Sequence, residues 1–243
     1  MEQIGDQELH AAGALFDADL GDDASWQLIF EAHDCRVHRQ RSPGSSLFRY
    51  RMEGHFDCSL AAYFNVLLDF EYYFKWDKNL KTWKKLGSAG STSLYRWEVK
   101  FPWPLSNREY VFLQRCGRLP NGVVVRVARS PASFHGIPER NSVVMVKDYV
   151  STTAMRTING RTEILLSYKD DLRGNIPSSA LNSAAQTAIP QGHRNMKAAI
   201  EKYAAFAGHK DAPWSMLSDI DVPNDCPLQA EHLKGHCDLQ AEE

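Results

Sequence analysis

The chain has 243 residues, 43% of them hydrophobic and 24% charged, which suits a globular protein with a substantial core. No run of the chain approaches the ~20 apolar residues of a membrane-spanning helix, and the first residues lack the basic and apolar regions of a secretory signal. The five cysteines are scattered and form no Cys-x-x-Cys pair, which argues against a disulfide framework and a zinc site. We therefore expect a reducing, cytoplasmic location, with no metal and no cofactor.

The net charge of −2 conceals a strong asymmetry along the chain. Residues 1–23 carry seven acidic side chains and no Lys or Arg, and residues 208–243 carry eight acidic side chains and two Lys. The body between them, 24–207, holds 26 basic and 15 acidic residues. A basic body suggests an anionic partner surface, either nucleic acid or an anionic membrane, unless the excess is spread evenly and serves only solubility.

The first predicted elements are a helix, a hairpin and a second helix. Residues 24–36 carry apolar side chains at spacings that favour a short amphipathic helix. The segment 35–56 then indicates two strands around a turn at 42–46. Residues 57–59 offer N-cap candidates for a helix that continues to Phe74.

A series of strand-like runs follows, separated by short clusters of Gly, Pro, Asn and Ser. Asn159-Gly160 is typical of a two-residue hairpin turn. The predicted strands are 80–86, 94–101, 110–116, 123–128, 143–151 and 162–169. About eight strands in hairpin succession, counting the first hairpin, predict an antiparallel sheet.

The carboxyl-terminal part of the chain changes character after Pro177. Residues 178–207 are rich in Ala and have helical apolar spacing, so we expect a long helix that Pro190 kinks or splits in two. The rest is acidic and without periodicity, as in a disordered tail. The sequence therefore predicts an acidic extension at 1–23, one domain at 24–207 and an acidic tail at 208–243. The fold class is α+β, with a strongly bent antiparallel sheet closed by a long C-terminal helix.

The sequence contains none of the common catalytic or nucleotide-binding motifs. There is no Gly-x-Ser-x-Gly elbow, phosphate-binding loop, dinucleotide fingerprint or His-Glu-x-x-His helix. Asp170 and Asp171 could form a carboxylate pair, but the polar segment 173–175 after them favours a solvated turn. Zinc-finger spacings are absent and the basic residues form no stripe, so nucleic acid is not expected as a partner.

The aromatic side chains of the segment 94–113 follow the two-residue period of strands. Two Trp, two Tyr and two Phe lie here, all on two predicted strands except Trp103, which is in the Pro-rich break between them. The alternation also places Tyr149 on one face of the run 143–151. This pattern predicts either core packing or a lined cavity. The inward faces would carry Tyr95, Trp97, Val99 and Phe101 on the first strand and Tyr110 and Phe112 on the second.

Four motifs together resemble the START domain, the StAR-related lipid transfer family. They are KWDKN (75–79), WEVKFPWPLSNREYVFL (97–113), VKDY (146–149) and GNIPSSALNSAA (174–185), in the family's order over a body of 24–207. The resemblance implies a helix-grip fold, in which a curved antiparallel sheet wraps around the C-terminal helix. It also implies an internal tunnel for one lipid, with that helix and a neighbouring loop as the gate.

In family members that carry phosphatidylcholine, an aromatic cage holds the choline group. The matching positions here are Trp97, Tyr110 and Tyr149, and Val99 shares the inward face of Trp97. A quaternary ammonium has no N–H to donate, so aromatic ring faces are a suitable way to bind it, at about 0.5–2 kcal/mol per contact.

The phosphate-binding position departs from the family pattern. The family has an arginine four residues before an aspartate; Asp77 matches the aspartate, but Tyr73 stands at the arginine position. Lys75 lies on roughly the opposite side of the helix. Another arginine could reach in from a strand, Tyr73 could donate its hydroxyl, or the ligand could differ. Because an unpaired buried carboxylate is costly, we expect Asp77 to find a partner or to lie near solvent.

The resemblance implies a non-enzymatic, cytoplasmic carrier of one phospholipid, most simply phosphatidylcholine or another choline lipid, in transient contact with membranes. Alternatives are a carrier of another lipid, such as a sterol, and a lipid-sensing module whose acidic tail docks a protein partner. An enzyme using Asp77 or His135 is disfavoured because no positioned acid–base pair is evident. The apolar side of 196–206 should pack over the tunnel or contact membranes.

Overall fold

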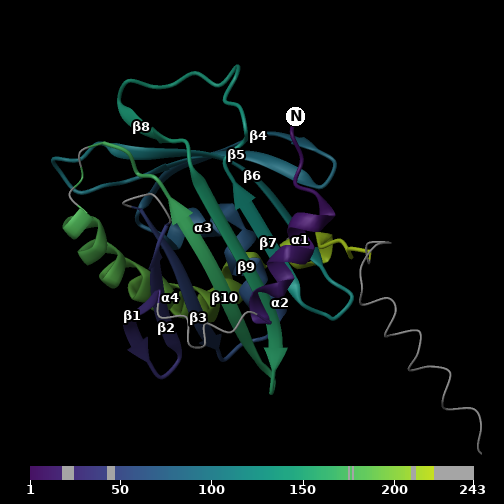
Figure 1. Ribbon diagram of the computed structural model, residues 1–243. Coiled ribbons are helices and arrows are strands. Elements are labelled where there is room, and N and C mark those ends of the chain that lie inside the picture. Colours follow the sequence, from purple (N-terminus) through teal and green to yellow (C-terminus); the bar gives the residue numbers. More distant parts are fainter. Residues whose placement is uncertain (18–24, 43–46, 175, 177, 209–211, 222–243) are drawn as a thin grey trace, which may run out of the picture.

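The computed structural model describes residues 1–17, 25–42, 47–174, 176, 178–208 and 212–221. Its centre is a ten-stranded sheet in the order β1-β2-β3-β10-β9-β7-β6-β5-β4, with β8 paired to β6 (Figure 1). All pairs are antiparallel except β6 with β8. The strands are β1 Trp26–Ala32, β2 Cys35–Arg41, β3 Phe48–Phe56, β4 Leu80–Ala89, β5 Thr92–Val99, β6 Asn107–Arg118, β7 Val124–Arg129, β8 Val143–Val146, β9 Tyr149–Ile158 and β10 Arg161–Asp170.

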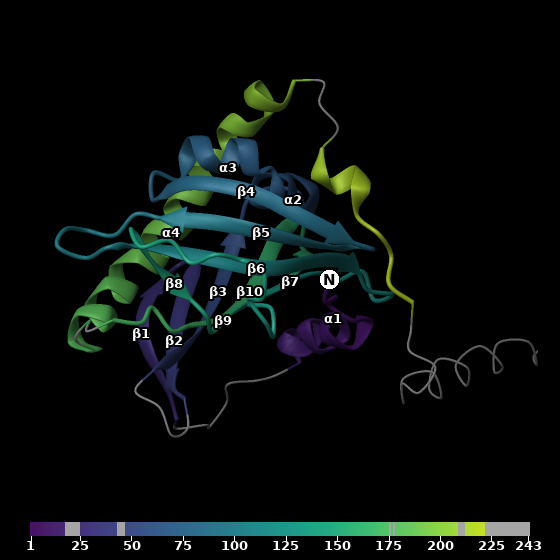
Figure 2. The ribbon, with the colours of Figure 1, turned by 90° about the horizontal axis from the view of Figure 1, so that it is seen from above.

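Helices cover both faces of this sheet. The long helix α4 and the short helices α2 and α3 lie on one face, and α1 lies on the other (Figure 2). This arrangement is the predicted helix-grip architecture of the α+β class. No helix in the described part of the chain has the length and hydropathy to cross a bilayer. The helices are α1 Asp6–Gly13, α2 Leu60–Leu68, α3 Phe70–Trp76 and α4 Ser178–Ala207, with 3-10 turns η1 Ala14–Phe16 and η2 Pro213–Met216.

The apolar side of α4 packs into the larger core. Met196, Ala199 and Tyr203 are 5%, 3% and 8% exposed, and they join a cluster with α2, α3 and strands of the sheet. The Tyr72 hydroxyl donates to the Ala199 carbonyl at 2.7 Å, which ties α3 to α4. Of the two predicted roles for this side of the helix, the described structure shows packing.

Two helical predictions are corrected. Residues 24–36 do not form a helix: Trp26–Ala32 is the edge strand β1, because pairing with β2 outweighs the local apolar spacing. The predicted helix 59–74 is two helices, and Asp69 ends α2 and caps α3 by accepting from the Tyr72 amide at 3.0 Å. Ser59 is the N-cap of α2, within the predicted 57–59, and accepts from the Ala62 amide at 3.2 Å.

Two further boundaries differ from the predictions. The run 143–151 divides into β8, which pairs in parallel with β6, and β9, which pairs with β7 and β10. The helix α4 continues through Pro190 and is not split, as the packing of its apolar side favours. The hairpin turn at Asn159-Gly160 is confirmed, since both residues have positive φ (50° and 76°).

The predicted domain limits also differ from the packing. The described residues 1–17 are not an extension beside the domain: Ile4 and Leu9 are buried against the outer face of the sheet, and Glu8 pairs with Arg129. In the expected tail, Ile220 is 5% exposed and also packs there, whereas Trp214 and Leu217 pack against the larger core. Residues 222–243, and most of the predicted turn 42–46, lie outside the described residues.

Candidate ligand-binding site

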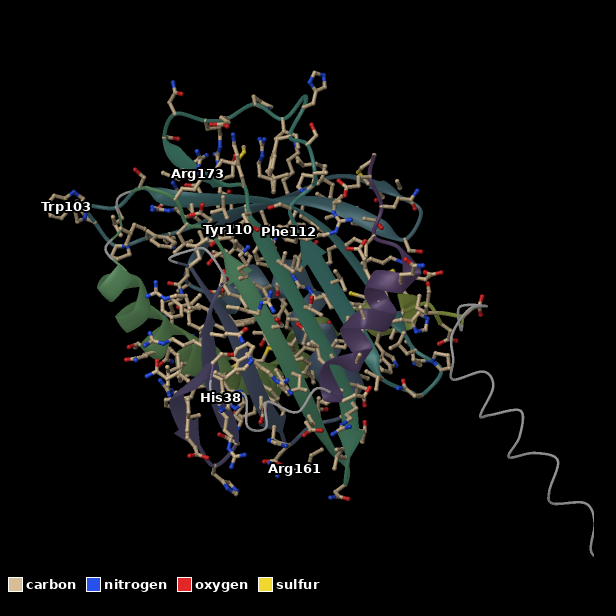
Figure 3. The ribbon with its side chains drawn as sticks, in the orientation of Figure 1. His38, Trp103, Tyr110, Phe112, Arg161 and Arg173 are labelled. Carbon is tan, nitrogen blue, oxygen red and sulfur yellow. The ribbon has the colours of Figure 1, made fainter. Side chains whose placement is uncertain are left out.

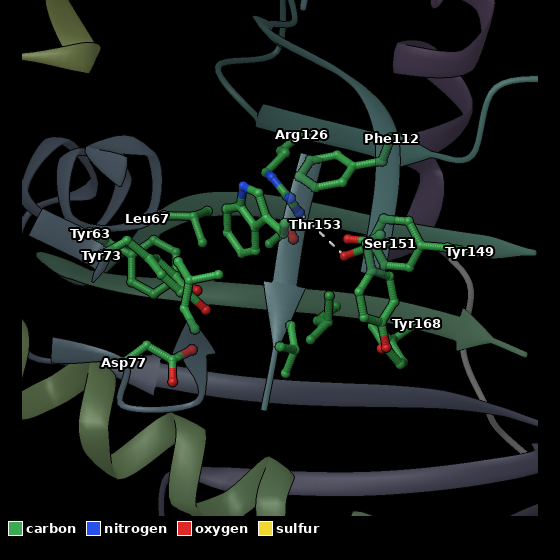
Figure 4. Close-up of a pocket in the computed structure, with 15 residues that line it drawn as sticks. Tyr63, Leu67, Tyr73, Asp77, Phe112, Arg126, Tyr149, Ser151, Thr153 and Tyr168 are labelled. Carbon is green, nitrogen blue, oxygen red and sulfur yellow. Dashed lines mark hydrogen bonds between the residues drawn. The ribbon is translucent and has the colours of Figure 1, made fainter. Parts of the chain in front are cut away.

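A cavity of about 310 Å³ lies between the concave face of the sheet and helices α2 and α3 (Figure 4). All six residues predicted for the site lie on its wall: Tyr73, Asp77, Trp97, Val99, Tyr110 and Tyr149. The remaining wall residues are Tyr63, Leu67, Leu80, Phe112, Arg126, Ser151, Thr153, Leu166 and Tyr168. Its size is near the lower end of the range of about 300–1,000 Å³ for small-ligand pockets.

Strand register brings the three predicted cage residues together. Trp97 on β5 is directly opposite Tyr110 on β6, so both side chains project from the same face of the sheet. The Tyr149 ring meets the Tyr110 ring edge-to-face at 5.3 Å, and the Phe112 ring lies 5.4 Å from Trp97 and 5.6 Å from Tyr149. The period-two prediction for 94–113 therefore identified the correct inward face.

Trp97 is held by rings from α3. The Phe70 ring lies 5.0 Å from it at 84°, and the Tyr73 ring lies 5.1 Å away. The Nε1 atom of Trp97 is buried and has no hydrogen-bond partner among the described residues. A buried donor without an acceptor is costly, so a ligand acceptor at this point of the wall would be stabilised.

The Asp77 carboxylate ends α3 and finds a partner, as predicted. It accepts from the Asn79 amide at 2.9 Å and is only partly buried. Burial and then the Asp77 charge raise the pKa of Tyr73, so the phenol stays neutral and can donate. Lys75 is not on the cavity wall; its ammonium lies 4.4 Å from the centre of the Phe206 ring.

A cation does enter the cavity, from a strand. Arg126 on β7 is 7% exposed and donates from Nε to Gln114 at 2.7 Å and from Nη1 to Ser151 at 3.3 Å (Figure 4). Among the described residues no carboxylate lies within ion-pair distance of it. This is an arginine that reaches in from a strand, as one of the three alternatives allowed, and its place among valines in 124–128 is the signal that could have identified it.

A second charge lies behind the cage. Asp170 accepts from the hydroxyls of Tyr110 and Tyr168, each at 2.7 Å, so the prediction of a solvated turn is wrong for this residue. Asp171 does lie beyond the strand and accepts from the Arg173 amide at 2.9 Å. Burial raises the pKa of Asp170, and the two tyrosine hydrogen bonds oppose that rise. The alternation of Leu166, Tyr168 and Asp170 on the inward face of β10 is the signal that could have identified it.

The wall has the chemistry of a binding site for a polar group on an apolar molecule. It combines aromatic faces, one guanidinium and several hydroxyls with Leu and Val side chains. His135, the other catalytic alternative, is exposed and is not on the wall. Within the described residues no group of three His, Cys, Asp or Glu side chains could hold a metal ion.

The fold and this cavity define a START domain. The START domain model matches residues 7–205, and the chain belongs to that family. The match begins within α1, in agreement with the packing of the first residues onto the sheet.

Within this family, the chain is similar in sequence or in structure to several lipid transfer proteins. The human phosphatidylcholine transfer protein is 31% identical over 185 residues, covering 74% of this chain and 86% of the relative. The mouse mitochondrial StAR-related lipid transfer protein 7 is 28% identical over 174 residues, covering 68% of this chain and 46% of the relative. The crystal structure of human STARD10 superposes with a TM-score of 0.75 at 17% identity, covering 92% of this chain and 97% of that one.

Proposed function

We propose that this protein is a non-enzymatic lipid transfer protein that binds one glycerophospholipid, with a choline headgroup in the cage of Trp97, Tyr110 and Tyr149. The family supports lipid transfer, and the relatives named for phosphatidylcholine transfer support the headgroup. The driving force is desolvation, because acyl chains gain about 0.8 kcal/mol per CH₂ on leaving water.

The observation that carries the proposal is the guanidinium of Arg126, which lies on the same wall as the cage and has no carboxylate partner in the described part of the chain. A buried cation without a carboxylate is costly, and a phosphodiester would relieve that cost with charge-assisted hydrogen bonds. Arg126 thereby takes the role of the arginine that the family pattern has at Tyr73. A sterol, which has no anionic group, would leave this charge uncompensated.

Transient membrane contact is part of the proposal. The apolar side of α4 is occupied by the core, whereas Trp103, in the connection between β5 and β6, is 92% exposed (Figure 3). Prolines on both sides stiffen this loop, and Trp favours the membrane–water interface. Trp103 is therefore the residue that we assign to first contact with a bilayer.

Native mass spectrometry of the purified protein, followed by identification of the released lipid, tests the proposal. We expect a 1:1 complex with a choline phospholipid, and uptake of phosphatidylcholine from vesicles after delipidation. Parallel vesicles with cholesterol, phosphatidylethanolamine or phosphatidic acid test the alternatives. Retention of a sterol, or no 1:1 uptake of any phospholipid, would refute it.

A further inference from the structure

The carboxylate of Asp170 is directly behind the proposed choline cage. In the β9–β10 pairing Asp170 is the register partner of Tyr149, so the two residues project from the same face of the sheet. Its Oδ2 accepts the hydroxyls of Tyr110 and Tyr168, whose rings both lie on the cavity wall. The Tyr149 ring stands between them, 5.3 Å from Tyr110 and 5.9 Å from Tyr168.

The charge of Asp170 is not paired with a cation among the described residues. The Asp170 charge acts electrostatically on Arg108, but that guanidinium donates its hydrogen bonds to the backbone carbonyls of Ser106, Leu172 and Arg173. Asp171 and Asp148 add further negative charge around the carboxylate. A carboxylate in this setting would be stabilised by a positively charged group that bound close to it.

The outer face of the same sheet shows how the chain treats other buried carboxylates. Glu98 and Glu109, 3% and 0% exposed, are both paired with Arg140, and Glu98 also accepts from Lys81 at 2.8 Å. Two buried acids there have protein cations as partners. Asp170, on the cavity side, has neutral hydroxyls as its partners, as expected of an acid whose cation arrives with a ligand.

The hydrogen bonds also change the rings that carry them. A phenol that donates to a carboxylate gains electron density, and its ring face becomes more attractive to a cation. Burial raises the pKa of both Tyr110 and Tyr168 well above the usual value, so each remains a neutral donor. The carboxylate therefore acts on a bound cation both through space and through the two rings.

We propose that Asp170, held by Tyr110 and Tyr168, is an anionic subsite that recognises the positive charge of a quaternary ammonium group. This inference rests on the proposed choline-lipid function. It adds a residue that recognises the charge of the headgroup, whereas the ring faces recognise its shape and polarizability. Among the described residues, Arg126 is a cation on the cavity wall without a carboxylate partner. Asp170, behind the cage, adds a second carboxylate without a cationic partner to that of Asp77 on the wall, and a cation and an anion at these two places match a zwitterionic headgroup.

The test compares phosphatidylcholine with its carbon isostere, the phosphatidyl ester of 3,3-dimethylbutanol, in which carbon replaces the quaternary nitrogen and only the phosphate charge remains. Each lipid is offered at the same low fraction in vesicles of otherwise neutral lipid to the delipidated full-length protein, and uptake is titrated. We expect the wild-type protein to prefer phosphatidylcholine. In Asp170→Asn this preference should fall by about tenfold, since loss of one charge–charge contact of ~1.4 kcal/mol has that effect.

Two variants complete the design. Asp148→Asn removes a carboxylate that is 48% exposed and paired with Lys169, so the preference should stay within about twofold of wild type. Tyr168→Phe keeps the ring and removes one hydroxyl, and it should lower the preference by about threefold. If Asp170→Asn does not fold, the preference measured for Tyr168→Phe tests the anionic subsite.

The outcomes separate this inference from the function on which it rests. Failure of the wild-type protein to take up phosphatidylcholine would remove both. Uptake with a preference that Asp170→Asn leaves unchanged, or that wild type never shows, would overturn the anionic subsite and leave the carrier function standing.

Discussion

Replacing Arg126 with Met should weaken phospholipid binding while leaving the unliganded protein about as stable as before. A hydrogen bond to a charged group is worth about 1.5–3 kcal/mol, so losing the phosphate contact should lower affinity by about tenfold to 150-fold. In the unliganded protein, the substitution has two opposing effects on the free energy of unfolding. It removes the hydrogen bonds to Gln114 and Ser151, and it also removes the cost of burying an unpaired guanidinium. We therefore expect a melting temperature within about 4 °C of wild type.

The matched control is Arg129→Met, on the same strand but facing the other way. Arg129 donates to Glu8 at 2.7 Å and to Glu2 at 2.5 Å, and it lies on the α1 side of the sheet. Its loss should cost roughly 1 kcal/mol of stability, because the pair is partly exposed, and should leave lipid uptake unchanged. The two variants thus separate binding from folding.

Both variants are measured by titrated uptake of phosphatidylcholine and by thermal unfolding without lipid. If Arg126→Met took up phosphatidylcholine as tightly as wild type, Arg126 would not bind the phosphate. If the melting temperature of that variant were many degrees lower than that of wild type, Arg126 would be a structural residue that happens to lie on the cavity wall.

Four further predictions concern the cage, the loop, the long helix and the tail. Trp97→Leu should reduce the preference for choline lipids over phosphatidic acid by about tenfold in vesicle uptake, and an unchanged preference would contradict the cage. Trp103→Ala should slow transfer between vesicles without changing which lipid co-purifies; equal rates would exclude this loop as the contact. Burial, and after it two basic neighbours, lowers the pKa of His193 to about 4. On acidification the His193 imidazole is therefore protonated in the unfolded chain before it is protonated in the folded protein. The free energy of unfolding measured in urea should fall by up to ~3 kcal/mol between pH 6.5 and 4 from this group, and His193→Gln should make the fall smaller. Deleting 222–243 should leave lipid transfer intact if the protein is a carrier, whereas loss of transfer would favour a sensing module.

Strand alternation was the most reliable signal in this sequence. A side-chain period of two depends only on backbone geometry, so the inward faces of 94–101 and 110–116 could be assigned without knowing the neighbours. The same rule would have placed Arg126 and Asp170 on inward faces. The phosphate-binding position left room for an arginine from a strand, but alternation alone does not show which of the strand arginines reaches the cavity.

The boundaries of elements depended on contacts that the sequence does not reveal. Residues 26–32 have helical spacing but form an edge strand, because β2 offers backbone hydrogen bonds that a short helix would forgo. The acidic composition of 1–23 suggested an extension, yet Ile4 and Leu9 are buried where the sheet presents an apolar outer face. Composition describes a segment alone, whereas burial depends on what lies opposite it.

The sequence by itself determined the family, the antiparallel sheet, the long last helix and three aromatic residues that line the cavity, because these follow from local periodicity and from contiguous motifs. Only the tertiary structure decided where the charges of the cavity lie. Arg126 and Asp170 are 44 residues apart in the sequence and come from different strands. Whether such charges have partners depends on side chains brought near by strand pairing, which no single segment of the chain encodes.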